Sequence, residues 1–180
     1  NGKIEFIEQK HIMRYQQMFA ALTVRSKIDE GVNSGVIWHT QGSGKTALSY
    51  YLTYVLSDYF SKQNKVAKFY FIVDRLDLLK QASEELMEQF RNNQAQEGNT
   101  GKPEITVVNI QRFAEDRSKV DLPAYATNLQ RVFIIDEAHR GYKPEGSFLA
   151  NLLDADKNAI KIALTGTPLL KEERESWSVF

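Results

Sequence analysis

Cysteine is absent from the 180 residues of this chain, which excludes disulfide bonds, thiolate catalysis and cysteine-ligated metal centres. Net charge is absent too, because 23 basic residues balance 23 acidic ones, so composition gives no electrostatic argument for a nucleic-acid or membrane partner. No apolar run approaches the roughly 20 residues that a membrane-spanning helix needs. The remaining composition, 42% hydrophobic and 26% charged, is typical of a globular domain, and we expect a soluble cytoplasmic protein.

Short apolar runs alternate with helical patterns along the chain. Between Leu48 and Tyr59 the apolar side chains recur at the spacing of a helix that buries one face. Five β-branched or aromatic runs predict strands, at residues 36–38, 69–73, 105–108, 132–135 and 160–164. Because strands that are apolar throughout are covered on both faces, the pattern predicts an α/β fold with a mainly parallel sheet flanked by helices.

A glycine-rich segment lies between the first predicted strand and the Leu48 helix. It matches the second half of the phosphate-loop pattern G-x-x-x-x-G-K-[ST] and contains Gly42, Ser43, Gly44, Lys45 and Thr46. Glycines let consecutive backbone N–H groups face one anion, and the helix N-terminus adds partial positive charge. In this pattern the lysine reaches the β and γ phosphates and the threonine hydroxyl binds Mg²⁺.

The loop departs from the pattern at its first position, where His39 replaces glycine. A chance match in an ordinary loop is the alternative interpretation. The strand before the loop and the amphipathic helix after it are the context that a phosphate loop requires, so the segment predicts a nucleotide site.

The predicted strand at residues 132–135 ends in two carboxylates, Asp136 and Glu137. In open α/β folds, ligands bind outside the carboxyl ends of the strands, where the phosphate loop also ends. Asp136 is suited to hold the Mg²⁺ that Thr46 touches, and Glu137 to orient and deprotonate the water that attacks the γ phosphate. An isolated Asp-Glu pair usually begins a solvated loop, but together with a phosphate loop it indicates metal-assisted phosphoryl transfer.

These motifs together resemble the helicase-like motor ATPases of superfamily 2. Residues 42–46 are similar to motif I, residues 136–139 to a DEAH-type motif II, and residues 164–168 (LTGTP) to motif III. The variants WHTQGSGKT at residues 38–46, VDR at 73–75 and IQRF at 110–113 resemble the motor subunit of type I restriction endonucleases. The resemblance implies a three-layer RecA-like P-loop NTPase fold and the cofactors ATP and Mg²⁺.

The resemblance also implies roles for residues outside the phosphate-loop motif and the acidic motif. Gln16 resembles the glutamine that contacts the adenine edge, with Gln17 as the adjacent alternative. Three residues resemble those that hold the phosphates of one DNA strand, namely Arg75, Gln111 and Arg112. Three others resemble groups that couple the nucleotide state to domain movement, namely His139, Thr165 and Thr167. The alternatives are an ordinary solvated Arg or Gln for the first set, an ordinary turn for the two threonines, and a capping histidine for His139.

Most of the chain falls within this resemblance. We expect residues 14–170 to form the first RecA-like domain, residues 1–13 to be a linker from an upstream domain, and residues 171–180 to begin a linker to a second RecA-like domain. The implied function is ATP-driven translocation of double-stranded DNA within a type I restriction endonuclease that includes modification and specificity subunits. We expect the isolated chain to bind ATP·Mg²⁺ weakly and to hydrolyse it negligibly.

Two other functions remain open at the level of sequence. One is a DEAH-type helicase or repair translocase outside restriction, which would share all three motifs. The other is a domain that docks on DNA or on a partner subunit and hydrolyses nothing.

Overall fold

A computed structural model of the chain describes residues 12–40, 42–73, 104–109, 128–136 and 156–166. These residues form two helices, α1 (Tyr15–Asp29) and α2 (Lys45–Ser61). They also form five strands, β1 (Ser34–Trp38), β2 (Val66–Val73), β3 (Glu104–Asn109), β4 (Leu129–Ile135) and β5 (Ile160–Thr165). Every predicted strand is confirmed, and each extends the apolar run that predicted it by one to three residues at an end.

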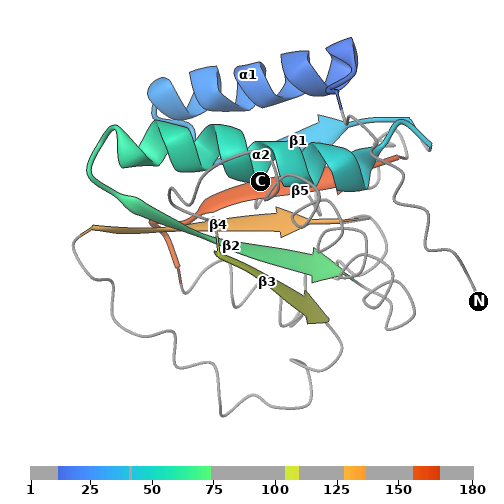
Figure 1. The fold of residues 1–180 in the computed structure, drawn as a ribbon. Coiled ribbons are helices and arrows are strands. Elements are labelled where there is room, and N and C mark those ends of the chain that lie inside the picture. Colours follow the sequence, from blue (N-terminus) through green and yellow to red (C-terminus); the bar gives the residue numbers. More distant parts are fainter. Residues whose placement is uncertain (1–11, 41, 74–103, 110–127, 137–155, 167–180) are drawn as a thin grey trace, which may run out of the picture.

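The five strands form one parallel sheet in the order β1-β5-β4-β2-β3. Both helices lie over the same face of this sheet (Figure 1). β4 and β5 are buried along almost their whole length, which fits the prediction of strands covered on both faces. The parallel α/β fold class is therefore confirmed.

The core lies between the helices and the helix-facing side of the sheet. Leu48, Leu52 and Leu56 of α2 are fully buried against side chains such as Phe69 of β2 and Ile134 of β4. Each fully buried side chain of this size contributes about 1.5–3 kcal/mol relative to an exposed one. This packing fixes α2, and therefore the loop that precedes it, against the sheet.

α2 is buried more extensively than its sequence pattern predicts. Tyr50 and Thr53, which lie outside the predicted apolar stripe, are 1% and 2% exposed. α2 contacts both α1 and β2, so it is packed on more than the single face that the stripe predicts. The Thr53 hydroxyl keeps a partner by donating to the Tyr50 carbonyl at 2.7 Å.

A buried ion pair joins β4 to the segment that leads into β5. Arg131 and Asp156 are both 2% exposed, and Arg131 Nη1 lies 3.1 Å from Asp156 Oδ2. Gln130 adds a second connection, because its Nε2 donates to the Asn158 carbonyl at 2.8 Å. These contacts lie at the amino end of the strands, opposite the edge where β1 leads into the glycine-rich loop.

Within the described part of the chain, neither helix has the length and hydropathy needed to span a bilayer.

Candidate nucleotide-binding site

The glycine-rich loop connects the end of β1 to the first residue of α2. Its sharp turns are made by Gly42 and Gly44, whose φ angles are +79° and +82°. L-residues with a Cβ rarely adopt this left-handed conformation, whereas glycine does so at no steric cost. Gly44 is also the residue that caps α2. The two glycines are therefore required by the backbone itself.

The structure explains why histidine is tolerated at position 39. Among the described residues Asn64 is the only non-glycine with positive φ, so His39 has an ordinary backbone conformation. The turn that needs glycine comes later in the loop. His39 instead contacts the loop with its side chain, because its Nδ1 lies 2.9 Å from the Ser43 hydroxyl oxygen. The departure from the sequence pattern therefore does not disturb the loop.

The N-terminus of α2 faces the end of this loop. In an α-helix the first N–H groups have no acceptor within the helix. In α2 the first such hydrogen bond runs from Leu48 N–H to the Gly44 carbonyl at 2.9 Å. The N–H groups of Lys45 and Thr46 belong to that first turn, and the 17-residue helix adds its dipole. Ser43 N–H, by contrast, closes a turn onto the Thr40 carbonyl at 3.1 Å. Among the described residues of this segment, the N–H groups placed to face an anion are therefore those of the helix terminus.

Asp136 follows directly after β4 and is partly exposed. Its backbone N–H donates to the Ile72 carbonyl of β2 at 2.9 Å, which fixes its position beyond the end of the strand. β5 lies between β4 and β1, and its last residue, Thr165, is completely buried and paired with Trp38. Because all three strands are parallel, the loop after β1, Thr165 and Asp136 share the carboxyl edge of the sheet.

The two adjacent glutamines of α1 lie in different surroundings. Gln17 is 4% exposed, accepts a hydrogen bond from Arg14 N–H at 2.9 Å and donates through Nε2 to the Gly44 carbonyl at 3.1 Å. Gln16 is exposed and makes none of these contacts. The sequence-based choice between Gln16 and Gln17 missed this link to the loop. Its only signal in the sequence is a glutamine in the first turn of a helix, where it can reach back to the preceding N–H.

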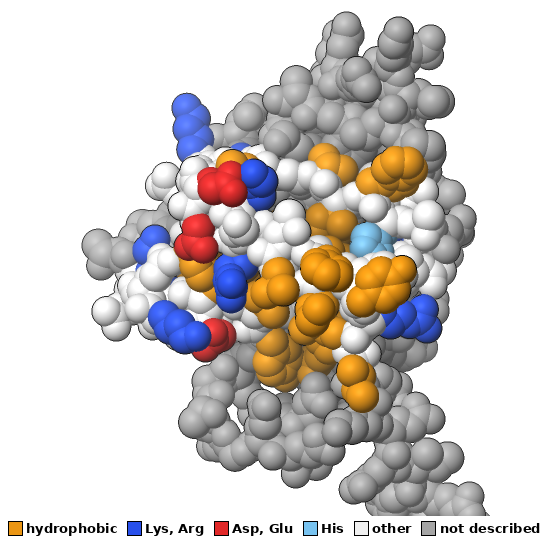
Figure 2. All heavy atoms as spheres, turned by 90° about the horizontal axis from the view of Figure 1, so that it is seen from above, with side chains coloured by type: hydrophobic (Ala, Val, Ile, Leu, Met, Phe, Trp, Pro, Cys, Tyr) orange, Lys and Arg blue, Asp and Glu red, His pale blue; other side chains and the backbone are white. Residues whose placement is uncertain are grey.

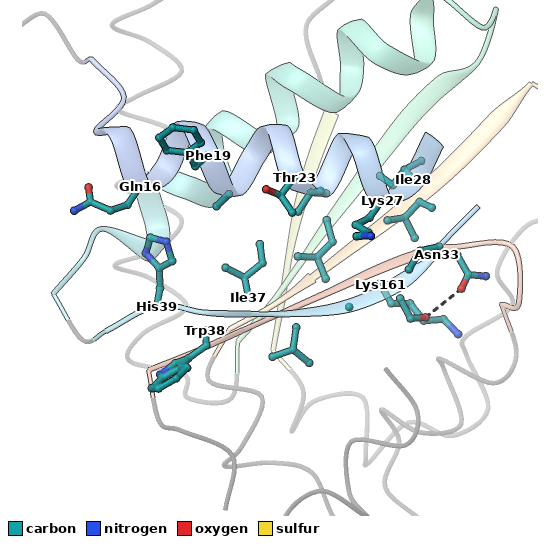
Figure 3. A pocket seen from close by; sticks show the side chains of 18 residues that line it. Gln16, Phe19, Thr23, Lys27, Ile28, Asn33, Ile37, Trp38, His39 and Lys161 are labelled. Carbon is teal, nitrogen blue, oxygen red and sulfur yellow. Dashed lines mark hydrogen bonds between the residues drawn. The ribbon is translucent and has the colours of Figure 1, made fainter. Parts of the chain in front are cut away.

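A groove of about 570 Å³ runs between α1 and β1, with Gln16, Phe19 and His39 near one end and Asn33 and Lys161 near the other (Figure 3). Ile37 points from β1 toward α1, and Trp38 points to the opposite side of the strand. Because His39 belongs to both the groove and the glycine-rich loop, the groove adjoins the candidate nucleotide site.

The first two turns of α1 expose a stripe of apolar side chains. Its exposed large side chains recur at helical spacing, namely Tyr15, Met18, Phe19 and Leu22. Figure 2 shows hydrophobic side chains gathered on the face seen from above, over the part of the molecule that contains α1. Sequence reasoning did not single out this stripe.

The described residues of the candidate site suit a Mg²⁺ ion that is bound jointly by the protein and by a nucleotide. Mg²⁺ usually keeps several waters and takes one or two carboxylates together with phosphate oxygens of its substrate. The Thr46 hydroxyl at the start of α2 and the Asp136 carboxylate beyond β4 are donors of that kind. Within the described ranges no group of three or more His, Asp or Glu side chains forms a metal cage. The donor set therefore suits a shared protein and phosphate site.

Several predicted site residues lie outside the described residues. They are Arg75, Gln111, Arg112, Glu137, His139 and Thr167, together with the two predicted linkers except for residues 12 and 13. Their assigned roles stay predictions. The described residues of the predicted site, by contrast, all belong to α1, to the loop and first turn of α2, or to the ends of β4 and β5.

Comparison with solved structures supports the fold. The SWI2/SNF2 ATPase core of Sulfolobus solfataricus, solved in complex with double-stranded DNA, matches 98% of this chain and 36% of its own with a TM-score of 0.64 at 19% identity. A nuclease-deletion mutant of the type ISP restriction-modification enzyme LlaGI, solved with a DNA substrate mimic, matches 90% of this chain and 18% of its own with a TM-score of 0.55 at 14% identity. The RecA-like fold is thereby confirmed.

Sequence comparison identifies the family. A type I restriction enzyme endonuclease subunit of Staphylococcus aureus (strain COL) is 33% identical over 171 residues, which are 89% of this chain. The matched part is 18% of that subunit, so the chain spans about a fifth of the length of this relative. The sequence profile of the SWI2/SNF2 ATPase family matches residues 16–180. The chain therefore belongs to the SWI2/SNF2 ATPase family.

Proposed function

We propose that residues 14–170 form the first RecA-like motor domain of an ATP-driven double-stranded DNA translocase, in the motor subunit of a type I restriction endonuclease. The observation that carries this proposal is the shared sheet edge. The loop after β1 and Asp136 after β4 flank the end of β5, in one parallel sheet. Phosphoryl transfer requires a phosphate-binding terminus and a metal-binding carboxylate beside one another.

Each residue at this edge has a chemical task. Lys45 and the N-terminus of α2 bind the β and γ phosphates, and Gly42, Ser43 and Gly44 shape the loop around them. Thr46 and Asp136 hold Mg²⁺, which when bound neutralises charge on the phosphate oxygens. Glu137, the next residue after Asp136, orients the attacking water and accepts its proton.

Gln16 is our candidate for the residue that contacts the adenine edge. It is exposed at the end of the groove that His39 shares with the phosphate loop. Gln17 supports the loop through Gly44 and is already bonded on both sides of its amide. Gln16 therefore retains the hydrogen-bonding capacity that a base requires.

The DNA contacts are proposed for Arg75, Gln111 and Arg112. β2 ends at Val73 and β3 at Asn109, so each of these residues follows within three positions of a strand end at the carboxyl edge. Guanidinium and amide groups there suit the phosphates of a DNA strand. Thr165, Thr167 and His139 are proposed to couple the nucleotide state to movement of the domain.

The partners are proposed from the relatives. A type I restriction enzyme subunit is similar over most of this chain, and both solved structures described above contain DNA or a DNA mimic. We therefore propose double-stranded DNA, modification subunits and specificity subunits as partners, in the cytoplasm.

The test is DNA-stimulated ATP hydrolysis by the full-length protein that contains this chain. We expect Lys45→Ala to abolish hydrolysis and to weaken binding of a fluorescent ATP analogue, with Lys62→Ala at the far end of α2 as the control lysine. Equal affinity of Lys45→Ala and wild type would contradict the proposal and favour a docking domain. Stimulation by RNA or by single strands alone would favour a helicase outside restriction.

The isolated chain gives a second test. As residues 14–170 are proposed to supply one side of an ATP site, we expect weak binding of ATP·Mg²⁺ and negligible turnover by the 180 residues alone. Rapid hydrolysis that does not depend on DNA would contradict this expectation.

A further inference from the structure

We infer that His39 is a positioning residue that joins the end of β5 to the phosphate loop through the Ser43 hydroxyl. The inference rests on the proposed function, because it assigns His39 a part in nucleotide binding that acts through Ser43. Two hydrogen bonds of His39 carry it, one from the backbone and one from the ring.

The backbone bond ties His39 to β5. Its N–H donates to the Thr165 carbonyl at 2.9 Å, which extends the pairing of Trp38 with Thr165 by one residue beyond β1. Thr165 is completely buried at the end of a fully buried strand. The first residue of the loop therefore has a rigid attachment.

The ring bond ties His39 to the far side of the loop. Nδ1 lies 2.9 Å from the Ser43 oxygen, four residues on, and both residues are partly buried. Either neutral tautomer supports this bond, because the serine hydroxyl both donates and accepts. A glycine at position 39, as in the phosphate-loop pattern, could not make it.

The loop needs such a restraint because of its glycines. Gly42 and Gly44 flank Ser43, and glycine loses more conformational freedom than any other residue when it becomes ordered. A bond that holds Ser43 before the ligand arrives removes part of that cost from binding. His39 thus raises nucleotide affinity by preorganising the loop.

The same geometry connects two motifs. A displacement of the Thr165 carbonyl moves the His39 backbone, and the ring transmits this movement to Ser43. Since Thr165 is proposed to respond to the state of the motor, His39 provides a physical path from that strand end to the phosphate loop.

The experiment compares four variants of the full-length protein, His39→Ala, His39→Asn, Ser43→Ala and the His39→Ala/Ser43→Ala double variant. An asparagine amide can occupy the position of Nδ1, so His39→Asn should retain near wild-type affinity. His39→Ala and Ser43→Ala should each weaken binding of a fluorescent ATP analogue about three- to tenfold, the effect of one ordinary hydrogen bond. The double variant should bind no more weakly than either single one, because the two residues share one bond.

A second readout concerns coupling. The ratio of DNA-stimulated to basal ATP hydrolysis should fall in His39→Ala and recover in His39→Asn. The matched control is Thr40→Ala, which removes an exposed side chain from the same loop but leaves the Thr40 carbonyl in place. It should leave both affinity and ratio unchanged.

Additive effects of His39→Ala and Ser43→Ala, or failure of His39→Asn to recover affinity, would overturn the inference. If Lys45→Ala abolishes binding while His39→Ala does not change it, only the role of His39 fails. If Lys45→Ala also leaves binding unchanged, the proposed function itself fails.

Discussion

Gln17 donates a hydrogen bond from its side-chain amide to the carbonyl oxygen of Gly44, which lies 27 residues later in the chain, at 3.1 Å. The amide oxygen at the same time accepts from Arg14 N–H. The start of α1 is thereby connected to the residue that caps α2. The glycine-rich loop is supported from three directions, namely by α1, by β5 and by its own turn.

Gln17→Ala should weaken both the fold and the site. Removing a buried amide that satisfies two backbone groups should lower the free energy of unfolding by about 1–3 kcal/mol. Because Gln17 acts through the loop, affinity for ATP and for GTP should fall by the same factor. Urea unfolding and nucleotide titration measure the two effects.

The neighbouring Gln16→Ala is the matched control for this prediction. Gln16 is exposed, so its loss should leave the free energy of unfolding within about 0.5 kcal/mol of wild type. If Gln16 contacts adenine, its variant should lose the preference for ATP over GTP. Equal destabilisation by the two alanine variants would show that the Gly44 contact is without energetic consequence.

Gly44→Ala should be more damaging than Gly42→Ala. Both glycines have left-handed φ, so alanine at either position costs about 1–2 kcal/mol in backbone strain. At Gly44 the new Cβ would also lie 2.7 Å from Gln17 Nε2, whereas at Gly42 it would meet open space. Thermal unfolding of the two variants measures the difference. In a Gln17→Ala background this difference should shrink, and its persistence would argue against the clash.

Asp156→Asn should destabilise the fold strongly. The variant removes the negative charge that pairs with the buried Arg131 guanidinium at 3.1 Å, and breaking a buried pair from one side costs about 3–5 kcal/mol. The control is Asp58→Asn in the exposed pair with Lys62, whose side chains are 65% and 72% exposed. That change should cost less than about 1 kcal/mol. Comparable unfolding midpoints for the two variants would refute the prediction.

Tyr59 should make stability depend on pH in alkaline solution. Burial, followed by its hydrogen bond to Asp29 Oδ1 at 2.8 Å, raises the pKa of Tyr59 above its ordinary value of 10.0. The folded state therefore holds the phenolic proton more tightly than the unfolded state. This stabilisation is complete below pH 10.0 and is lost as the pH rises through the higher pKa of the folded state.

Tyr59→Phe should remove this part of the alkaline loss. The free-energy difference between wild type and variant, measured by urea unfolding at a series of pH values, should be constant below pH 10.0 and decrease above it. Tyr51 is the control, because burial alone raises its pKa and no bond to Asp29 contributes. Asp29→Asn should lower the pKa of Tyr59 without changing that of Tyr51. A flat difference across the alkaline range would contradict the assignment.

Much of the fold could be predicted from local patterns. The continuous apolar runs at Phe69 and Val132 became parallel strands, and the strand at Val132 is buried from Gln130 to Ile135, as burial on both faces requires. The glycines of the loop were identified because they match the phosphate-loop pattern, and the structure gives Gly42 and Gly44 the left-handed backbone that favours glycine. The burial of Tyr50 could not be predicted, because tertiary packing and not helical periodicity determines it.

The sequence by itself determined which chemical groups the candidate site offers, because Lys45, Thr46 and Asp136 bring a cation, a hydroxyl and a carboxylate in recognisable local patterns. Only the tertiary structure decided which neighbours support them. It placed Thr165 between the two motifs, bonded Gln17 rather than Gln16 to the loop, and set the His39 ring against Ser43. The physical reason is that a hydrogen bond depends on distance in space, and strand order and helix packing, not spacing along the chain, set that distance.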